Sequence, residues 1–145
     1  MGATLDLMVH DLDLLRQFIR TEPVQVDAAG SGDRSDGQDE VEARIVFACG
    51  AVADLTASRI APRLERSMGL TYETGDVSFD FLERRIINRT DMRLDQPDQT
   101  SQKATDPLGY GVNSFIDSVR TGAPAAVSGR DGRRAVELAE RIEIA

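Results

Sequence analysis

Two side chains that can move a proton lie four residues apart near the start of the chain. Asp6 and His10 fall within a run whose apolar residues recur at the spacing of one helical face: Leu5, Met8, Val9, Leu12, Leu15 and Ile19. A helix over residues 4–20 places the two side chains one turn apart on one side. His10 is the only histidine, and a paired imidazole is the commonest general acid or base near neutral pH. A solvated pair at a helix start is the alternative interpretation.

Length and composition bound the class of protein. The chain has 145 residues, 41% hydrophobic and 29% charged, which predicts one globular domain over residues 1–145. No apolar run reaches the length of a membrane span and no signal peptide opens the chain, so we expect a cytoplasmic protein. The net charge of −8 repels phosphate backbones and anionic lipids. Nucleic acid and membranes are therefore not expected as partners.

Several common sites are missing from the sequence. A single cysteine, Cys49, allows no internal disulfide and with one histidine offers no ligand set for structural zinc. The polar loop at residues 30–39 is acidic but lacks the calcium-loop pattern, so no metal is predicted. Neither Gly-x-Gly-x-x-Gly nor Gly-x-Ser-x-Gly occurs. The chain by itself is thus expected to bind no dinucleotide and to be no self-contained hydrolase.

The middle of the chain is predicted to be a meander of strands. Residues 40–48 alternate cleanly, with Val41, Ala43, Ile45 and Phe47 on one side. Cys49-Gly50 is predicted as a two-residue turn, in which the glycine supplies the positive φ that a primed turn needs, and Gly75-Asp76 is predicted as another turn. The remaining strands are expected at residues 24–29, 51–60, 66–73, 77–81 and 84–89. The predicted fold class is α+β, an open and mostly antiparallel sheet of about five or six strands with helices packed on one face.

The uncovered face of that sheet is a candidate for subunit pairing. It displays the small or hydroxylic residues Thr56, Ser58, Thr71 and Ser78 among acids, and a sheet covered on one side often pairs subunits. We therefore expect a homo-oligomer formed through the open sheet face.

Two helices are predicted to close the chain after a structureless stretch at residues 90–106. The first begins at Pro107 with Asp106 as its cap, carries the apolar stripe Leu108, Val112, Phe115, Ile116 and Val119, and stops at Gly122. Ser128 to Asp131 has the form of a capping box for the second, although the two glycines and three arginines of Ser128 to Arg134 also allow an anion site. Its buried side is predicted to be Ala135, Val136, Leu138, Ala139 and Ile142.

The order of these segments resembles the C-terminal domain of the Gfo/Idh/MocA oxidoreductases, the glucose-fructose oxidoreductase and inositol dehydrogenase family. Residues 2–13 look like the family's Gly-x-x-x-Asp-x-x-x-His segment, in which Gly2, Asp6 and His10 match. Residues 115–124 and 127–139 are similar to the family's closing helix, turn and helix. The resemblance covers essentially the whole chain.

The resemblance implies a function for the opening helix. Enzymes of this family move a hydride between NAD or NADP and a hydroxyl-bearing carbon of a sugar, cyclitol or nucleotide-sugar. It implies that His10 is the catalytic acid/base, that Asp6 positions or polarises it, and that the substrate is a small, sugar-like molecule. The family's dinucleotide-binding domain and its Glu-Lys-Pro lysine have no counterpart here. We therefore expect a C-terminal substrate-binding and oligomerisation domain, inactive alone; a stand-alone, non-catalytic binding module is the alternative.

Overall fold

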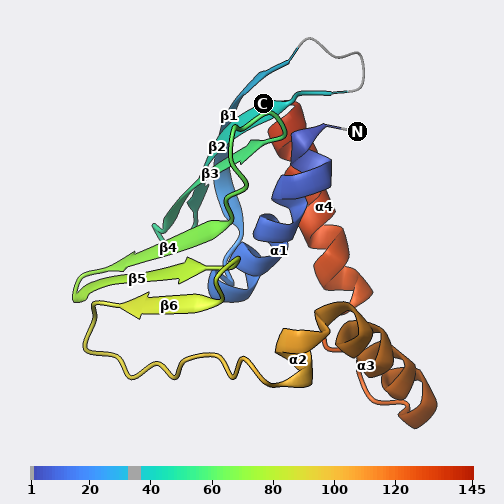
Figure 1. Ribbon diagram of the computed structural model, residues 1–145. Coiled ribbons are helices and arrows are strands. Elements are labelled where there is room, and N and C mark those ends of the chain that lie inside the picture. Colours follow the sequence, from blue (N-terminus) through green and yellow to red (C-terminus); the bar gives the residue numbers. More distant parts are fainter. Residues whose placement is uncertain (1, 33–36) are drawn as a thin grey trace. The chain divides into compact units, whose positions relative to one another are not determined.

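The structure is a computed structural model that describes residues 2–32 and 37–145 (Figure 1). The chain divides into two compact units, one of Met1–Pro62 with Val127–Ala145 and one of Arg63–Ala126. The first holds η1 (Thr4–Met8), α1 (Val9–Phe18), β1 (Pro23–Ser31), β2 (Glu40–Phe47), β3 (Val52–Ser58) and α4 (Gly129–Glu143). The second holds β4 (Ser67–Tyr72), β5 (Gly75–Asp80), β6 (Arg85–Asn88), α2 (Gln102–Thr105) and α3 (Pro107–Thr121).

The predicted α+β class and the antiparallel pairing are confirmed. The strands form two three-stranded sheets, β1-β2-β3 and β4-β5-β6, instead of one continuous sheet. The break falls between β3 and β4, in the segment that contains Pro62. Proline has no N–H and so cannot donate a hydrogen bond to a neighbouring strand. Each sheet therefore belongs to one unit of the chain.

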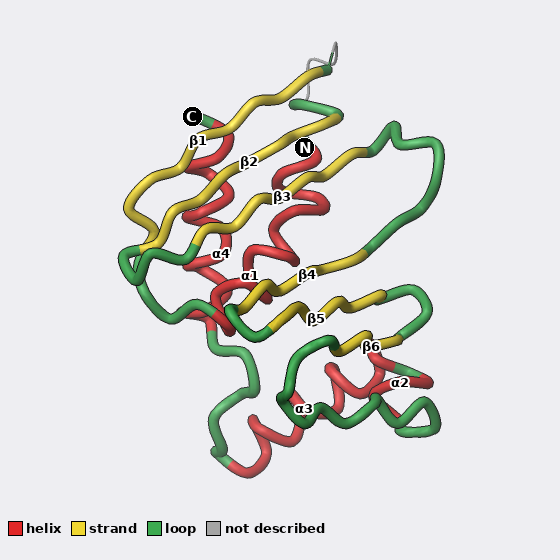
Figure 2. The backbone as a smooth tube through the Cα atoms, turned by 90° about the vertical axis from the view of Figure 1, so that its left-hand side faces the viewer, coloured by secondary structure: helices red, strands yellow, loops and turns green. Residues whose placement is uncertain are grey.

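In the first unit, α1 and α4 cover one face of the sheet (Figures 1 and 2). The predicted alternation of β2 is confirmed, because Val41, Ala43, Ile45 and Phe47 are all 5% exposed or less. They pack with Met8, Leu12 and Leu15 of the first helix and with Leu138, Ala139 and Ile142 of α4. At about 1.5–3 kcal/mol for each large apolar side chain, this burial fixes the helices on the sheet.

The turn between β2 and β3 is longer than predicted. It consists of Ala48, Cys49 and Gly50, because the Phe47 N–H donates to Ala51 O (2.9 Å) and the Gly50 N–H donates to Phe47 O (2.8 Å). Gly50 has φ 85°, the left-handed conformation that closes a three-residue hairpin loop. The need for glycine was predicted correctly, while the two-residue length was wrong. Cys49 lies in this turn, as expected, and is exposed.

The first helix ends earlier than predicted and is fastened to the strand that follows. α1 stops at Phe18, and Ile19 is already extended. Arg16, whose side chain is only 10% exposed, donates to Thr21 O (2.8 Å) and to Glu22 Oε1 (2.9 Å). This hydrogen bond and the charge of Arg16 hold the pKa of the Glu22 carboxyl below its usual range. Arg16 thereby fixes the angle at which the helix leads into β1.

The second unit contains a hairpin whose turn differs from the prediction. Tyr72 pairs with Gly75, so the turn is Glu73-Thr74 and Gly75 already belongs to β5. Gly75 has φ +136°, and a Cβ built there would overlap the carbonyl oxygen of Arg89. Glycine is thus required for a close approach of backbone rather than for the turn.

Residues 90–106, predicted to lack structure, contain the short helix α2 and fasten themselves to β6. The side-chain amide of Gln96 donates to Ile86 O (2.8 Å) and accepts from the Ile86 N–H (3.2 Å). Gln99 donates to Arg84 O (2.7 Å). Figure 2 shows this segment running beside the edge of the sheet. The amide of Gln96 therefore satisfies backbone groups that an edge strand leaves open.

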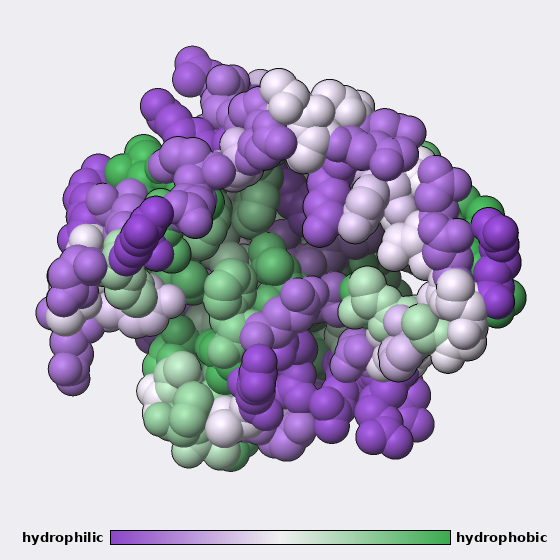
Figure 3. All heavy atoms as spheres, turned by 90° about the horizontal axis from the view of Figure 1, so that it is seen from below, coloured by the Kyte–Doolittle hydropathy of each residue, from purple (hydrophilic) through white to green (hydrophobic). Residues whose placement is uncertain are grey.

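The start and end of α3 agree with the sequence. The Asp106 carboxylate accepts from the Gly109 N–H (2.9 Å), and Gly122 ends the helix at φ 73°. Its apolar stripe, however, is exposed: Leu108 79%, Val112 51%, Phe115 61%, Ile116 48% and Val119 68%. Figure 3 shows from one side that hydrophobic side chains reach the surface of the protein among hydrophilic ones.

The capping box of α4 is confirmed. Ser128 Oγ accepts from the Asp131 N–H (3.3 Å), and Asp131 Oδ2 accepts from the Ser128 N–H (3.0 Å). The Asp131 carboxylate occupies the position that the anion-site interpretation gave to a ligand. Ala135, Leu138, Ala139 and Ile142 are buried as predicted. Val136 is 42% exposed, so its predicted burial was wrong.

No helix in the described part of the chain is long and apolar enough to span a lipid bilayer.

Candidate functional site

The helix that carries Asp6 and His10 begins with a π-turn. Residues Thr4–Met8 form η1, in which the Val9 N–H donates to Thr4 O five residues back, and α1 continues the same helix from Val9. π-turns are rare and occur frequently at functional sites, because the extra residue displaces side chains from the regular helical positions. The sequence pattern predicted a helix here but not its π form.

Both predicted site residues reach the surface of this helix. Asp6 lies in η1 and His10 in α1, and both are exposed. Within the described residues no hydrogen bond or ion pair joins the two side chains. Asp6 instead faces Arg59, whose Nε lies 3.7 Å from Asp6 Oδ2. The structure therefore places Asp6 and His10 on one exposed helix and adds a cation that the sequence analysis did not include.

Arg59 comes directly after β3 and is tied to the entrance of β2. The Arg59 N–H donates to Asp39 O (2.8 Å). Gln38, the residue before Asp39, accepts from the Ala3 N–H through its carbonyl oxygen (2.8 Å). Asp6 N–H in turn donates to Gly2 O (3.0 Å). The beginning of η1, the entrance of β2 and the exit of β3 are thus joined at one corner of the first unit.

Thr4 lies beneath this corner. The residue is fully buried, and its hydroxyl oxygen has no hydrogen-bond partner within the described residues. Buried polar groups are usually paired, so this hydroxyl is an exception at the first residue of the π-turn.

No metal site accompanies these residues. The described part of the chain contains no group of three or more histidine, cysteine, aspartate or glutamate side chains placed to hold an ion. The acidic loop at residues 30–39 includes residues 33–36, which lie outside the described residues. The chemistry available at the corner is therefore that of an imidazole, a carboxylate and a guanidinium.

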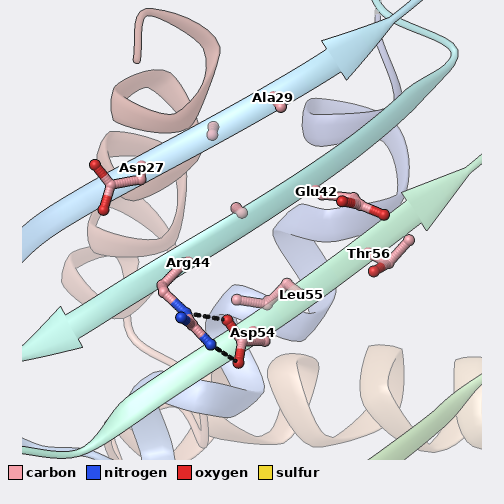
Figure 4. Close-up of a pocket in the computed structure, with 9 residues that line it drawn as sticks. Asp27, Ala29, Glu42, Arg44, Asp54, Leu55 and Thr56 are labelled. Carbon is pink, nitrogen blue, oxygen red and sulfur yellow. Dashed lines mark hydrogen bonds and ion pairs between the residues drawn. The ribbon is translucent and has the colours of Figure 1, made fainter.

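The outer face of the first sheet is polar and uncovered by helices (Figure 4). Asp27, Glu42 and Asp54 direct carboxylates from it, and Arg44 pairs with Asp54 through two hydrogen bonds of 2.6 and 2.8 Å. That bonding lowers the pKa of the Asp54 carboxyl. Thr56 is exposed on the same face, whereas Ser58 donates to Glu40 (2.7 Å).

Comparison with known proteins gives this helix and these sheets a family. A sequence model of the GFO/IDH/MocA C-terminal domain matches residues 1–78, which include Asp6, His10 and Arg59. The chain belongs to the GFO/IDH/MocA C-terminal domain family. The predicted resemblance is thereby confirmed.

Two curated relatives and a further solved structure match along nearly the whole chain. UDP-N-acetylglucosamine 3-dehydrogenase from Acidithiobacillus ferrooxidans is 29% identical over 97% of this chain; its crystal structure aligns with TM-score 0.82 and 30% identity, covering 98% of this chain and 46% of that one. Myo-inositol 2-dehydrogenase from Thermotoga maritima is 28% identical over 94% of this chain and 44% of its own length. The WlbA dehydrogenase from Bordetella pertussis, crystallised with NADH and UDP-GlcNAcA, shares the fold at TM-score 0.79 and 21% identity over 97% of this chain and 44% of that one.

The chain spans 47% of the first of these curated relatives and 44% of the second. The comparisons thus establish the family of this domain.

Proposed function

We propose that the chain is the substrate-facing C-terminal domain of a nicotinamide-dependent dehydrogenase that oxidises a hydroxyl group of a nucleotide-sugar, sugar or cyclitol. The observation that carries the proposal is the exposure of Asp6 and His10 on one helix. By sequence the two residues resemble the family's Asp-x-x-x-His segment, and they fall within the range that the family model covers. The relatives matched along the chain are dehydrogenases of UDP-N-acetylglucosamine and of myo-inositol.

His10 and Asp6 have separate roles in this proposal. A nicotinamide cofactor, when bound, supplies the hydride acceptor. The imidazole of His10 accepts the proton of the substrate hydroxyl as the carbon loses its hydride, so that the alcohol becomes a ketone. The carboxylate of Asp6 compensates the positive charge that His10 gains and restricts the orientation of the imidazole. His10 is thus the catalytic residue and Asp6 its positioning residue.

The described residues contribute to the substrate side of the reaction only. All strand pairs among them are antiparallel, and the sequence lacks the glycine pattern that cradles a dinucleotide. We therefore assign no residue of this chain to the cofactor. In the complete enzyme, NAD or NADP would be bound by a separate dinucleotide-binding domain.

The test is a kinetic comparison in the protein made from the complete open reading frame. NAD⁺ and NADP⁺ reduction is followed with UDP-N-acetylglucosamine and myo-inositol as substrates. His10→Asn should lower kcat about 10²–10⁴-fold, the usual contribution of a general base. Asp13→Asn, on the same helix, is the matched control and should retain activity, because the Asp13 carboxylate accepts from the Gln17 side chain (3.4 Å) away from the proposed site. Full kcat in His10→Asn, or no turnover by the wild-type protein, contradicts the proposal.

We propose in addition that the outer face of β1-β2-β3 pairs subunits. It is the face that α1 and α4 leave uncovered, and it presents Thr56 of the edge strand β3 among charged side chains. Thr56→Lys, alone or with Ser58→Lys, should convert an oligomer to monomers in light-scattering chromatography. Val136→Lys on the exposed side of α4 is the control. A monomeric wild-type protein would end this proposal.

A further inference from the structure

We propose that Arg59 is a positioning residue for the Asp6–His10 pair, an inference that rests on the function proposed above. In this role Arg59 acts through Asp6, which it contacts. The guanidinium holds the Asp6 carboxylate in place while His10 gains and loses its proton.

The main observation is a closed ring of contacts around Asp6. The Asp6 N–H donates to Gly2 O (3.0 Å), the Ala3 N–H donates to Gln38 O (2.8 Å), and the Arg59 N–H donates to Asp39 O (2.8 Å). Because Gly2 is followed by Ala3 and Gln38 by Asp39, these hydrogen bonds connect Asp6 with Arg59 through the backbone. The ion pair between Arg59 Nε and Asp6 Oδ2 (3.7 Å) closes the ring. Three of its four links are backbone hydrogen bonds at ordinary distances. Arg59 is therefore anchored by its backbone, and only its side chain reaches the carboxylate.

The geometry of the ion pair fits a positioning role. At 3.7 Å the contact is ionic and longer than a direct hydrogen bond, and catalytic contacts are often long before substrate binds and tighten afterwards. The side chains of Arg59 and Asp6 are 35% and 46% exposed, so the pair faces a surface that substrate can reach. The π-turn displaces Asp6 from the position it would have in a regular α-helix, and in this position its carboxylate lies against Arg59.

A second ion pair offers a matched comparison. Arg89 also follows a strand, β6, and its Nη1 lies 2.8 Å from Asp76 Oδ2, with side chains 63% and 41% exposed. It lies on the other unit of the chain and has no histidine beside it in the sequence. Exposed pairs of this kind contribute little to stability. If Arg59 only stabilised the fold, neutralising either arginine would have the same small effect.

The experiment compares Arg59→Gln, Arg59→Lys, Asp6→Asn and the double variant, with Arg89→Gln as control, in the protein made from the complete open reading frame. Arg59→Gln should lower kcat about tenfold with KM changed less than about twofold, because the substrate contacts remain. Arg59→Lys should keep kcat within about threefold of the wild-type value, because an ionic contact needs a positive charge and does not need the planar guanidinium group. Asp6→Asn/Arg59→Gln should be no slower than Asp6→Asn alone.

The outcomes that overturn the inference differ from those that overturn the proposed function. Wild-type kcat in Arg59→Gln, equal losses in Arg59→Gln and Arg89→Gln, or additive losses in the double variant would refute the role of Arg59. Absence of dehydrogenase activity in the wild-type protein would refute the proposed function instead.

The coupling between Arg59 and His10 can also be measured by NMR, without enzymatic turnover. The chain has one histidine, so its imidazole gives an unambiguous NMR signal. Arg59→Gln should move that signal in the wild-type chain and leave it unmoved in the Asp6→Asn chain, because Arg59 acts through Asp6. Arg89→Gln should move it in neither. An Arg59→Gln spectrum identical to that of the wild type refutes the coupling.

Discussion

Replacing Gln96 by alanine should uncover the outer edge of β6. The amide of Gln96 both donates to Ile86 O (2.8 Å) and accepts from the Ile86 N–H (3.2 Å), as a neighbouring strand would. In the antiparallel register with β5, Ile86 lies opposite Phe79 and Ile87 opposite Ser78. The backbone groups of successive residues point to opposite sides of a strand, so those of Ile86 face Gln96 and those of Ile87 face β5. Loss of the Gln96 side chain therefore affects one residue of the strand and spares the next.

The magnitude follows from the two hydrogen bonds. Each contributes about 0.5–1.5 kcal/mol net, and water replaces part of it at an exposed edge, so their loss should cost about 1–2 kcal/mol. That corresponds to about a 5- to 30-fold increase in local opening. Gln99 still donates to Arg84 O (2.7 Å), so the segment stays attached at a second point.

Amide hydrogen exchange measured by NMR tests this directly. The Ile86 amide should exchange about 5- to 30-fold faster in Gln96→Ala, while Ile87 serves as the internal reference. Gln96→Glu keeps the acceptor for the Ile86 N–H but sets a carboxylate against Ile86 O. Its Ile86 exchange rate should lie between those of the wild type and Gln96→Ala. Gln102→Ala, on an exposed residue of α2, is the control. Unchanged exchange at Ile86 relative to Ile87 would refute the proposed edge protection.

Three further measurements test other parts of the chain. Gly75→Ala should lower the free energy of unfolding by about 1–3 kcal/mol, because φ is +136° and a Cβ would overlap Arg89 O; Gly69→Ala, where a Cβ meets nothing within 4 Å, is the control, and equal urea midpoints would contradict the prediction. The Ser128 hydroxyl and N–H hold the pKa of the Asp131 carboxyl below its ordinary value of 3.8, so its stabilisation is present above the unfolded-state pKa and lost as pH falls through the folded-state value. As pH is lowered, the melting temperature should therefore fall further in the wild type than in Asp131→Asn. An equal fall in both proteins would argue against a stabilising role of the Asp131 carboxylate. Titration of the 145-residue chain with NADH or NADPH should give no saturable fluorescence change, and micromolar binding would overturn the assignment of the cofactor to another domain.

The features predicted correctly from the sequence are those whose cause lies within a few residues. The alternation of β2 follows from the side-chain period of a strand. The caps of α3 and α4 follow from Asp106 and from Ser128 with Asp131, which bond to backbone groups three residues away. Gly50 was predicted for its left-handed backbone, which is a property of the residue itself.

The features predicted wrongly depend on segments distant in the sequence. Gly75 was assigned to a turn because glycine usually marks one, but here it makes room for Arg89 O. The Gln96 contact pairs a side chain with backbone ten residues earlier, and no local pattern announces it. The division into two sheets depends on whether β3 and β4 pair with each other. The alternation of side chains along each strand is the same whether or not they pair, so the sequence pattern does not distinguish one sheet from two.

The two closing helices show the limit of amphipathic patterns. α3 and α4 both carry an apolar stripe, yet α4 buries Ala139 fully against the first helix and the sheet, while Phe115 of α3 is 61% exposed. Periodicity identifies the side of a helix that avoids water but does not identify the surface that covers it.

The candidate site divides in the same way. Asp6 and His10 share one helix, so their spacing alone predicted that they lie on one side. Arg59 was missed, although the alternation of β3 contains its signal: Ala57 is buried beneath the helices, and Arg59, two residues on, continues the same side of the chain beyond the core. A charged group at that position is partly removed from water and gains from an opposite charge at the rim of the core. Asp6, at the first turn of the helix, is the carboxylate that meets it.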